Sequence, residues 1–130
     1  MNNRIEWFKI VHDKDGKEIK MTENRPMDIT DARFEDEVLS VKGISVVDFW
    51  APWCGPCHSM APGLESFAKA NNGRVKVFKL DVDDNPKTAE RFEIRSVPTV
   101  IFFKDGEVVD TSPKALSETV LQTRLDSLLK

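Results

Sequence analysis

The sequence has no tyrosine among its 130 residues and only two cysteines, both in the run WCGPC at residues 53–57. Two cysteines in a single motif argue against the disulfide framework that staples small secreted proteins. No apolar run approaches the ~18 residues that a membrane-spanning helix needs. Residues 1–9 are interrupted by charged side chains and lack the apolar core of a secretory signal. Together these absences predict a cytoplasmic protein.

An excess of basic charge is also missing. Lys and Arg number 19 against 22 for Asp and Glu, which gives a net charge of −3, and the basic side chains are scattered. This distribution argues against a surface for nucleic acid or for an anionic membrane. With 130 residues and no internal repeat, the chain fits one domain whose core needs no metal or disulfide staple.

The WCGPC run predicts a reactive pair of thiols. It follows the apolar stretch 46–50, and this order indicates a buried strand, a tight turn and then a helix with Cys54 at its N-terminus. Free backbone N–H groups and the helix dipole stabilise a thiolate there, and a thiolate is the form that attacks disulfides. Cys54 is therefore the candidate nucleophile. Cys57, one turn further along the same face and less exposed, is the candidate resolving thiol.

The residues between the cysteines suit this geometry. Gly55 permits a tight approach of the chain, and Pro56 fits the first turn of a helix because its φ is already fixed. The alternative is that the cysteines form half of a zinc site. Zinc takes four ligands, however, and only His12 and His58 could assist. We therefore expect no metal.

Asp48 is an acidic residue within the apolar strand that precedes the cysteines. Desolvation would favour its neutral form and raise its pKa, which suits proton exchange with the Cys57 thiol near neutral pH. The alternative is an ordinary carboxylate at an exposed strand position, since acids are seldom buried. The neighbouring motif favours the catalytic interpretation.

Alternating strand and helix patterns predict an α/β fold with a mixed sheet. Residues 1–24 suggest a hairpin with its turn at 13–16. This hairpin is either a peripheral cover or arm, or a docking element that uses Trp7 and Phe8.

Thr30 or Asp31 is the expected cap of the first helix, and Pro62 should kink the second helix. We expect strands at 24–29, 44–50, 75–82, 99–103 and 108–111, and helices at 32–39, 54–71, 86–92 and 117–129. The last helix carries its apolar stripe at Val120, Leu121, Leu125, Leu128 and Leu129.

Residues 47–57, VDFWAPWCGPC, resemble the active-site segment of the thioredoxin family. An Asp six residues before the first cysteine and a Val-Pro-Thr about forty residues after it make this much more specific than a lone CxxC. The likeness extends from about residue 25 to the C-terminus. It implies a thioredoxin fold, with a mixed central sheet of four or five strands flanked by helices, in a domain at 25–130 that follows an extension at 1–24.

The resemblance also implies roles for other residues. Lys79 matches a buried lysine that pairs with the carboxylate of Asp48. Pro98 matches a cis-proline in the loop opposite the cysteines, which leaves the Val97 backbone free to pair with an extended substrate. The implied apolar docking face consists of Trp53, Pro56, Val82, Val97 and Pro113, with Lys114 beside it. Without the family, Trp53 could equally be a core aromatic.

The chain departs from the family pattern in four places that bear on partner choice. His58 stands where Lys or Arg commonly follows the second cysteine. The local charge would then depend on pH near about 6.5, although a solvated surface side chain is the simpler interpretation. Lys114 occupies the place of a glycine beside the docking face, and Glu93 and Ser96 also replace glycines.

The sequence thus predicts a monomeric protein-disulfide reductase that works through a mixed disulfide. By resemblance it binds no cofactor and receives electrons from NADPH through a thioredoxin reductase. Two alternatives remain open: an oxidase or isomerase of an export compartment, and a redox-silent binding module that uses the fold as a scaffold.

Overall fold

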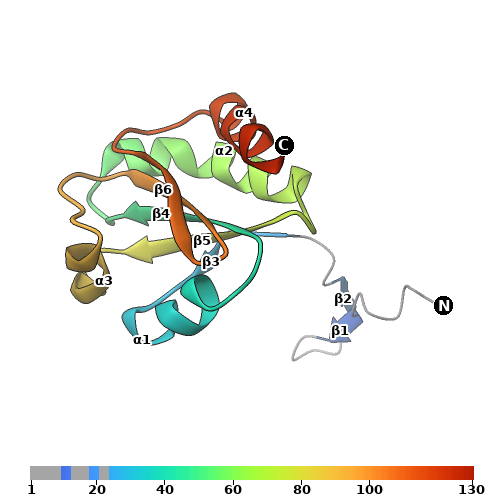
Figure 1. Ribbon diagram of the computed structural model, residues 1–130, viewed down its shortest axis with the longest axis horizontal. Helices are drawn as coiled ribbons and strands as arrows, with labels where there is room; N and C mark the ends of the chain where they lie inside the picture. The colour runs from blue at the N-terminus through green and yellow to red at the C-terminus, as the bar shows by residue number, and fades with distance from the viewer. Residues whose placement is uncertain (1–9, 13–17, 21–23) are drawn as a thin grey trace.

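The computed structural model describes residues 10–12, 18–20 and 24–130. Its centre is a five-stranded sheet with the order β3-β5-β4-β6-β7 (Figure 1). The strands are β3 (Met27–Asp28), β4 (Ile44–Trp50), β5 (Val75–Asp81), β6 (Thr99–Lys104) and β7 (Glu107–Ser112), and the helices are α1 (Asp31–Phe34), the π-helix η2 (Glu35–Leu39), α2 (Gly55–Ala70), α3 (Pro86–Arg91) and α4 (Glu118–Leu129). The predicted thioredoxin fold with a mixed sheet is confirmed.

Strand β4 lies at the middle of the sheet because nearly all of its residues are apolar and suit burial on both faces. Its first six residues are buried. It pairs in parallel with β5 and antiparallel with β6, and the registers place Asp48 opposite both Lys79 and Val100. The strand that leads into the cysteine motif is therefore fixed on both edges, which gives the following turn a rigid base.

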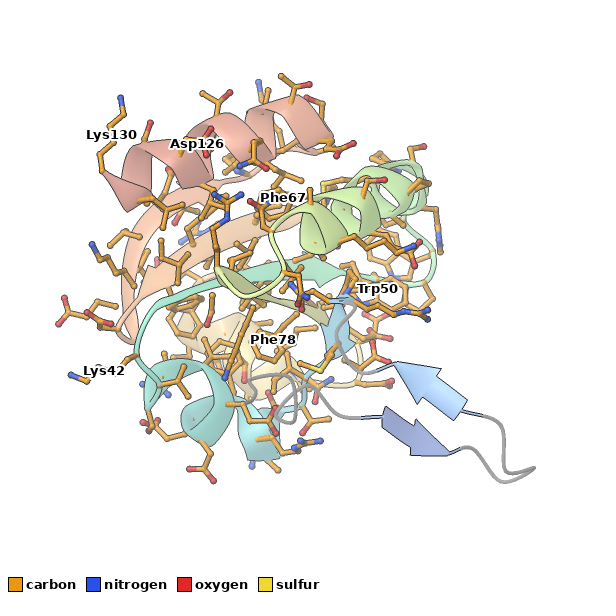
Figure 2. The ribbon with its side chains drawn as sticks, turned by 90° about the vertical axis from the view of Figure 1, so that its right-hand side faces the viewer. Lys42, Trp50, Phe67, Phe78, Asp126 and Lys130 are labelled. Carbon is orange, nitrogen blue, oxygen red and sulfur yellow. A yellow bond between two sulfur atoms is a disulfide. The ribbon has the colours of Figure 1, made fainter. Side chains whose placement is uncertain are left out.

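Two layers of helix enclose the sheet. Helices α2 and α4 cover one face, and α1 and α3 lie on the other (Figure 1). Figure 2 shows Phe67 on the side of α2 and α4, and Phe78 on the opposite side, toward α1. Both side chains are buried, each in its own apolar cluster. This packing holds α2, and with it the cysteines, against the central strands.

The first helix differs from its prediction. Only residues 31–34 are α-helical, and a π-helix continues to Leu39. Thr30 occupies the N-cap position without a side-chain cap bond. The Asp31 carboxylate does not cap its own helix, because it accepts hydrogen bonds from the Thr88 amide at 2.8 Å and the Thr88 hydroxyl at 2.6 Å. Asp31 therefore joins α1 to α3.

The predicted apolar stripe of α4 is wrong at two positions. Leu121 and Leu125 are fully buried and Leu128 packs against the core, whereas Val120 is 38% and Leu129 45% exposed. Residues 121, 125 and 128 are spaced at i, i+4 and i+7 and share one helix face. Val120 and Leu129 flank that face by one residue each, so the rotation per residue turns them toward solvent.

The N-terminal residues that the structure describes form a short antiparallel pair of strands. Strand β1 (Ile10–His12) pairs with β2 (Glu18–Lys20), while the turn predicted between them lies outside the described residues. Asn24, the first of the continuously described residues 24–130, is bonded to two elements of the fold. Its side-chain amide donates 3.0 Å hydrogen bonds to the carbonyls of Ala68, near the end of α2, and Val75, at the start of β5.

Gly106, in the turn between β6 and β7, supports a prediction about stability. Its φ is +86°, and an added Cβ would overlap the Leu39 backbone carbonyl. We expect Gly106→Ala to lower the free energy of unfolding by about 3 kcal/mol, because strain and a backbone clash add together. Gly73 has φ +89° but open space around it, so Gly73→Ala should cost only about 1 kcal/mol. Equal losses in urea unfolding of the two variants would contradict this reasoning.

Candidate active site

Cys54 and Cys57 form a disulfide at the start of α2. Cys54 is the N-cap residue in an extended conformation, and Pro56 lies in the first turn. The backbone N–H of Cys57 points at the Cys54 sulfur, with a distance of 3.1 Å between nitrogen and Sγ. This N–H belongs to the first turn of α2, where backbone donors have no partner within the helix. It therefore already faces the sulfur atom that would carry negative charge once the disulfide is reduced.

The two cysteines are equally buried, each 3% exposed. The expectation that Cys54 is the more exposed is therefore wrong for the disulfide form. The reason is the cover above its sulfur: Cys54 packs in a small cluster against Val82 and Val97, and its Sγ lies 3.5 Å from the Val97 carbonyl oxygen.

Asp48 is buried in β4, with 1% of its surface exposed. Its Oδ1 has no hydrogen-bond partner among the described residues. Burial raises the pKa of this carboxyl to about 7, and the positive charge of Lys79 lowers it in part. Lys79 faces Asp48 across the β4–β5 pairing, but burial has the larger effect, and the pKa of the carboxyl therefore lies near neutrality.

Trp50 joins three elements below the active-site turn. It is half-buried at the end of β4, and Figure 2 shows it below α2. The Lys79 ammonium lies 4.5 Å from the centre of its ring, and the His58 ring meets it edge-on at 6.0 Å. Trp50 therefore has a packing role, as a support between β5 and the first turn of α2.

His58 has a contact that sequence reasoning missed. Its side chain is exposed, yet Nε2 lies 2.7 Å from the Pro52 carbonyl oxygen. A carbonyl can only accept a hydrogen bond, so this nitrogen carries the proton. The bond closes the loop before Cys54 onto α2, and the only sequence signal for it was a histidine one position after the motif.

The loop opposite the cysteines contains a cis peptide bond between Val97 and Pro98. Pro98 is buried and Val97 is half-buried. The Ser96 hydroxyl donates a 3.5 Å hydrogen bond to the Pro113 carbonyl, which places the loop beside residues 113 and 114. The two loops thus lie side by side, and Val97 of the first loop contacts Cys54.

Trp53 is 71% exposed and does not belong to the core. Its indole N–H donates a 2.9 Å hydrogen bond to the Asp83 carboxylate, another contact that the sequence did not reveal. This bond fixes the ring next to the cysteines, with Val82 half-buried beside it. Pro56, Pro113 and Lys114 are exposed. Of the expected docking face, Val82 and Val97 pack against the cluster that contains both cysteines, and Trp53 and Pro56 adjoin the cysteines in the chain.

The part of the chain that the structure describes holds neither a candidate metal site nor a helix that could span a membrane. There, no three His, Cys, Asp or Glu side chains are arranged to hold a metal ion. The helices found among the same residues are too short or too polar to cross a bilayer.

A disulfide that closes one turn of helix, with a backbone donor aimed at one sulfur, suits reversible thiol–disulfide exchange, because the donor stabilises the thiolate that reduction produces. That property defines the thiol-disulfide oxidoreductases, and this chain is one of them. The family model named Thioredoxin matches residues 25–127. The chain belongs to the thioredoxin family.

Curated relatives agree with this assignment. The thioredoxin of Staphylococcus saprophyticus subsp. saprophyticus is 54% identical over 82 residues, which cover 63% of this chain and 77% of that protein. Thioredoxin 1 of Synechococcus elongatus is 46% identical over 101 residues, 78% of this chain and 94% of that protein. The thioredoxin of Rhodospirillum rubrum is 46% identical over 93 residues, 72% of this chain and 89% of that protein.

Proposed function

We propose that Cys54 is the attacking thiol in the reduction of protein disulfides and that Cys57 is the resolving thiol. The observation that carries this assignment is the 3.1 Å contact between the Cys57 N–H and the Cys54 sulfur. The Cys54 thiolate attacks one sulfur of the target, expels the other as a thiolate and forms a mixed disulfide. Cys57 then attacks the Cys54 sulfur and releases the second thiol. Two electrons pass from the dithiol to the target.

Asp48 is the proposed proton acceptor for Cys57. A base is needed because a thiol attacks only after it loses its proton. Burial places the pKa of the Asp48 carboxyl at about 7, so the group can take a proton from Cys57 and return it to water at neutral pH. Lys79, opposite it in β5, is a structural partner in this proposal rather than a reactant. Pro56 lies in the first helical turn, whereas the tight approach expected at Gly55 is not found, because a Cβ there would meet no atom within 4 Å.

The proposed docking face comprises the exposed and half-buried side chains around the disulfide. An extended segment of the target would pair with the backbone at Val97, next to cis-Pro98. Exposed apolar side chains near the reacting sulfur, Trp53 above all, favour binding of a polypeptide. The remaining members are Pro56, Val82, Pro113 and Lys114.

By resemblance to the family, we also propose a route for re-reduction. A thioredoxin reductase would return the disulfide to the dithiol with electrons from NADPH, so that the chain itself needs no bound cofactor. In this proposal the protein is a cytoplasmic monomer, and residues 1–24 are a peripheral extension to the domain at 25–130.

Insulin reduction tests the proposed activity. We expect micromolar protein to accelerate the precipitation of insulin chains by dithiothreitol, and NADPH with a bacterial thioredoxin reductase to replace dithiothreitol as electron source. The reduction potential should lie near about −270 mV. A potential well above about −200 mV would favour the oxidase or isomerase instead. No acceleration at all would favour a redox-silent module.

A further inference from the structure

An open groove of about 580 Å³ lies on the face of α2 that turns toward the start of α4. It is lined by Pro56, Ser59, Met60 and Gly63 of α2 and by Ala115 and Leu116 of the segment that leads into α4. Its volume falls within the roughly 300–1,000 Å³ typical of sites for small organic groups. The proposed docking face includes only Pro56 from this set.

The floor of the groove is apolar and ordered. Met60 is 5% and Leu116 8% exposed, and both belong to the core cluster on this side of the sheet. The Leu116 backbone N–H contacts the Met60 sulfur at 3.3 Å. A side chain that enters the groove would therefore meet a fixed apolar surface, and burying it there would be favourable.

The groove exists because two neighbouring turns of α2 carry small residues, Ser59 and Gly63. The glycine is not required by its own backbone, which is ordinary α-helix. A Cβ at position 63 would lie 3.5 Å from the Glu118 nitrogen, an ordinary contact. Glycine inside a helix is less stable than alanine by roughly 0.5–1 kcal/mol. What Gly63 provides in exchange is close packing of the start of α4 against α2, since a Cβ would already be in van der Waals contact with Glu118.

The position of the groove points to its occupant. Pro56, at one end, lies between the two cysteines, and Gly63, at the other end, is seven residues further along α2. Seven residues of helix span about 10 Å, and an extended chain covers that distance in about three residues. A polypeptide joined to Cys54 through a mixed disulfide therefore has side chains that can reach the groove.

We propose that this groove is a specificity subsite for the protein substrate. It receives a bulky aliphatic or aromatic side chain two to four residues from the target cysteine. The small Ser59 side chain determines this specificity by keeping the groove open, and Gly63 lines the groove further along α2. The inference rests on the proposed attack by Cys54 and adds a substrate class to it: proteins whose reducible disulfide is flanked by a large apolar residue.

The test uses nine-residue peptides with a central cysteine, joined as symmetrical disulfide dimers. The peptides are built from alanine and lysine, and one leucine is moved through positions −4 to +4. The second-order rate constant for oxidation of the reduced full-length protein is measured by chromatography for each peptide. We expect leucine at one or two positions to raise this constant about tenfold over alanine, as burial of one such side chain allows.

Filling the groove should remove that preference. In Ser59→Leu, and more weakly in Gly63→Ala, the ratio of rate constants for the leucine and alanine peptides should fall toward one. Ser66→Leu is the matched control, because Ser66 is an exposed serine of α2 outside the groove lining. This variant should keep the full tenfold ratio.

The outcomes separate the two proposals. A native protein that reduces insulin but shows no positional preference, or a preference that survives Ser59→Leu, overturns the groove subsite alone. A native protein that reduces neither insulin nor the peptides overturns the proposed function and this inference together. Sedimentation gives a further outcome: the native protein could be a dimer and the Ser59→Leu variant a monomer. The groove would then bind a second copy of the chain, and this result would also overturn the proposal.

Discussion

The Cys54→Ser protein is expected to reduce insulin no faster than dithiothreitol alone, a loss of about a thousandfold or more, because a serine hydroxyl stays protonated at neutral pH. The Cys57→Ser protein should lose turnover as well, but for a different reason. Its Cys54 still attacks the target, and without the second thiol the mixed disulfide is not released. Incubation with insulin should therefore give a covalent adduct that is visible on non-reducing gels.

The two variants control for each other, since each removes one sulfur from the same turn of helix. Adduct formation by Cys54→Ser instead of Cys57→Ser would reverse the assigned roles. Adducts with both variants in equal amount would mean that the Cys57 N–H, which faces only the Cys54 sulfur, does not distinguish the two thiols.

For Asp48→Asn we expect a large change in how stability depends on pH. The native pKa of Asp48, about 7, lies above the ordinary value of 3.8. Between these two values the native state holds a proton that the unfolded state releases, so the free energy of unfolding falls as pH rises. The fall amounts to about 4 kcal/mol, is complete above pH 7 and is absent below pH 3.8. Asparagine cannot ionise and should remove it.

Urea unfolding of the disulfide form at pH 4, 6 and 8 measures this effect. The Asn variant should exceed the native protein in stability at pH 8 and approach it at pH 4. Asp36→Asn, which changes an exposed carboxylate of η2, should leave the native pH profile in place. Parallel profiles for the native protein and Asp48→Asn would show that the buried carboxyl is not the group responsible.

The same variant also tests the proposed proton transfer. Release of the mixed disulfide should slow in Asp48→Asn while the first attack by Cys54 keeps its rate, because only the Cys57 thiol depends on the base. Stopped-flow mixing of the reduced variant with insulin separates the two steps. Unchanged release would leave Asp48 with a role in stability alone.

Much of the site could be read from the sequence because its parts are close together in the chain. The β-branched and apolar run at residues 44–50 allows little besides a buried strand, and Gly55-Pro56 after it starts a helix with few alternatives. The burial of Asp48 follows from the same run. These local patterns placed the two cysteines and the acid correctly in the fold.

What the sequence could not reveal are contacts that depend on how distant loops meet. Trp53 bonds Asp83 across 30 residues, and Asp31 bonds Thr88 across 57. Polar side chains such as Asp83 and Asp31 have many possible partners, and only the folded positions of the loops select one. The equal burial of Cys54 and Cys57 has the same origin, since the cover over Cys54 comes from Val82 and Val97.

The position of Asn24 shows where the protein can be joined to a support or a tag without covering the cysteines. Its side-chain amide donates a hydrogen bond to the Ala68 carbonyl. Ala68 is fourteen residues after Cys54, which corresponds to roughly 20 Å of helix. A surface, a tag or a carrier protein joined to the chain at Asn24 itself would start from the end of α2 that lies away from the cysteines. Immobilised in this way, the protein would keep its cysteines turned outward to incoming polypeptides.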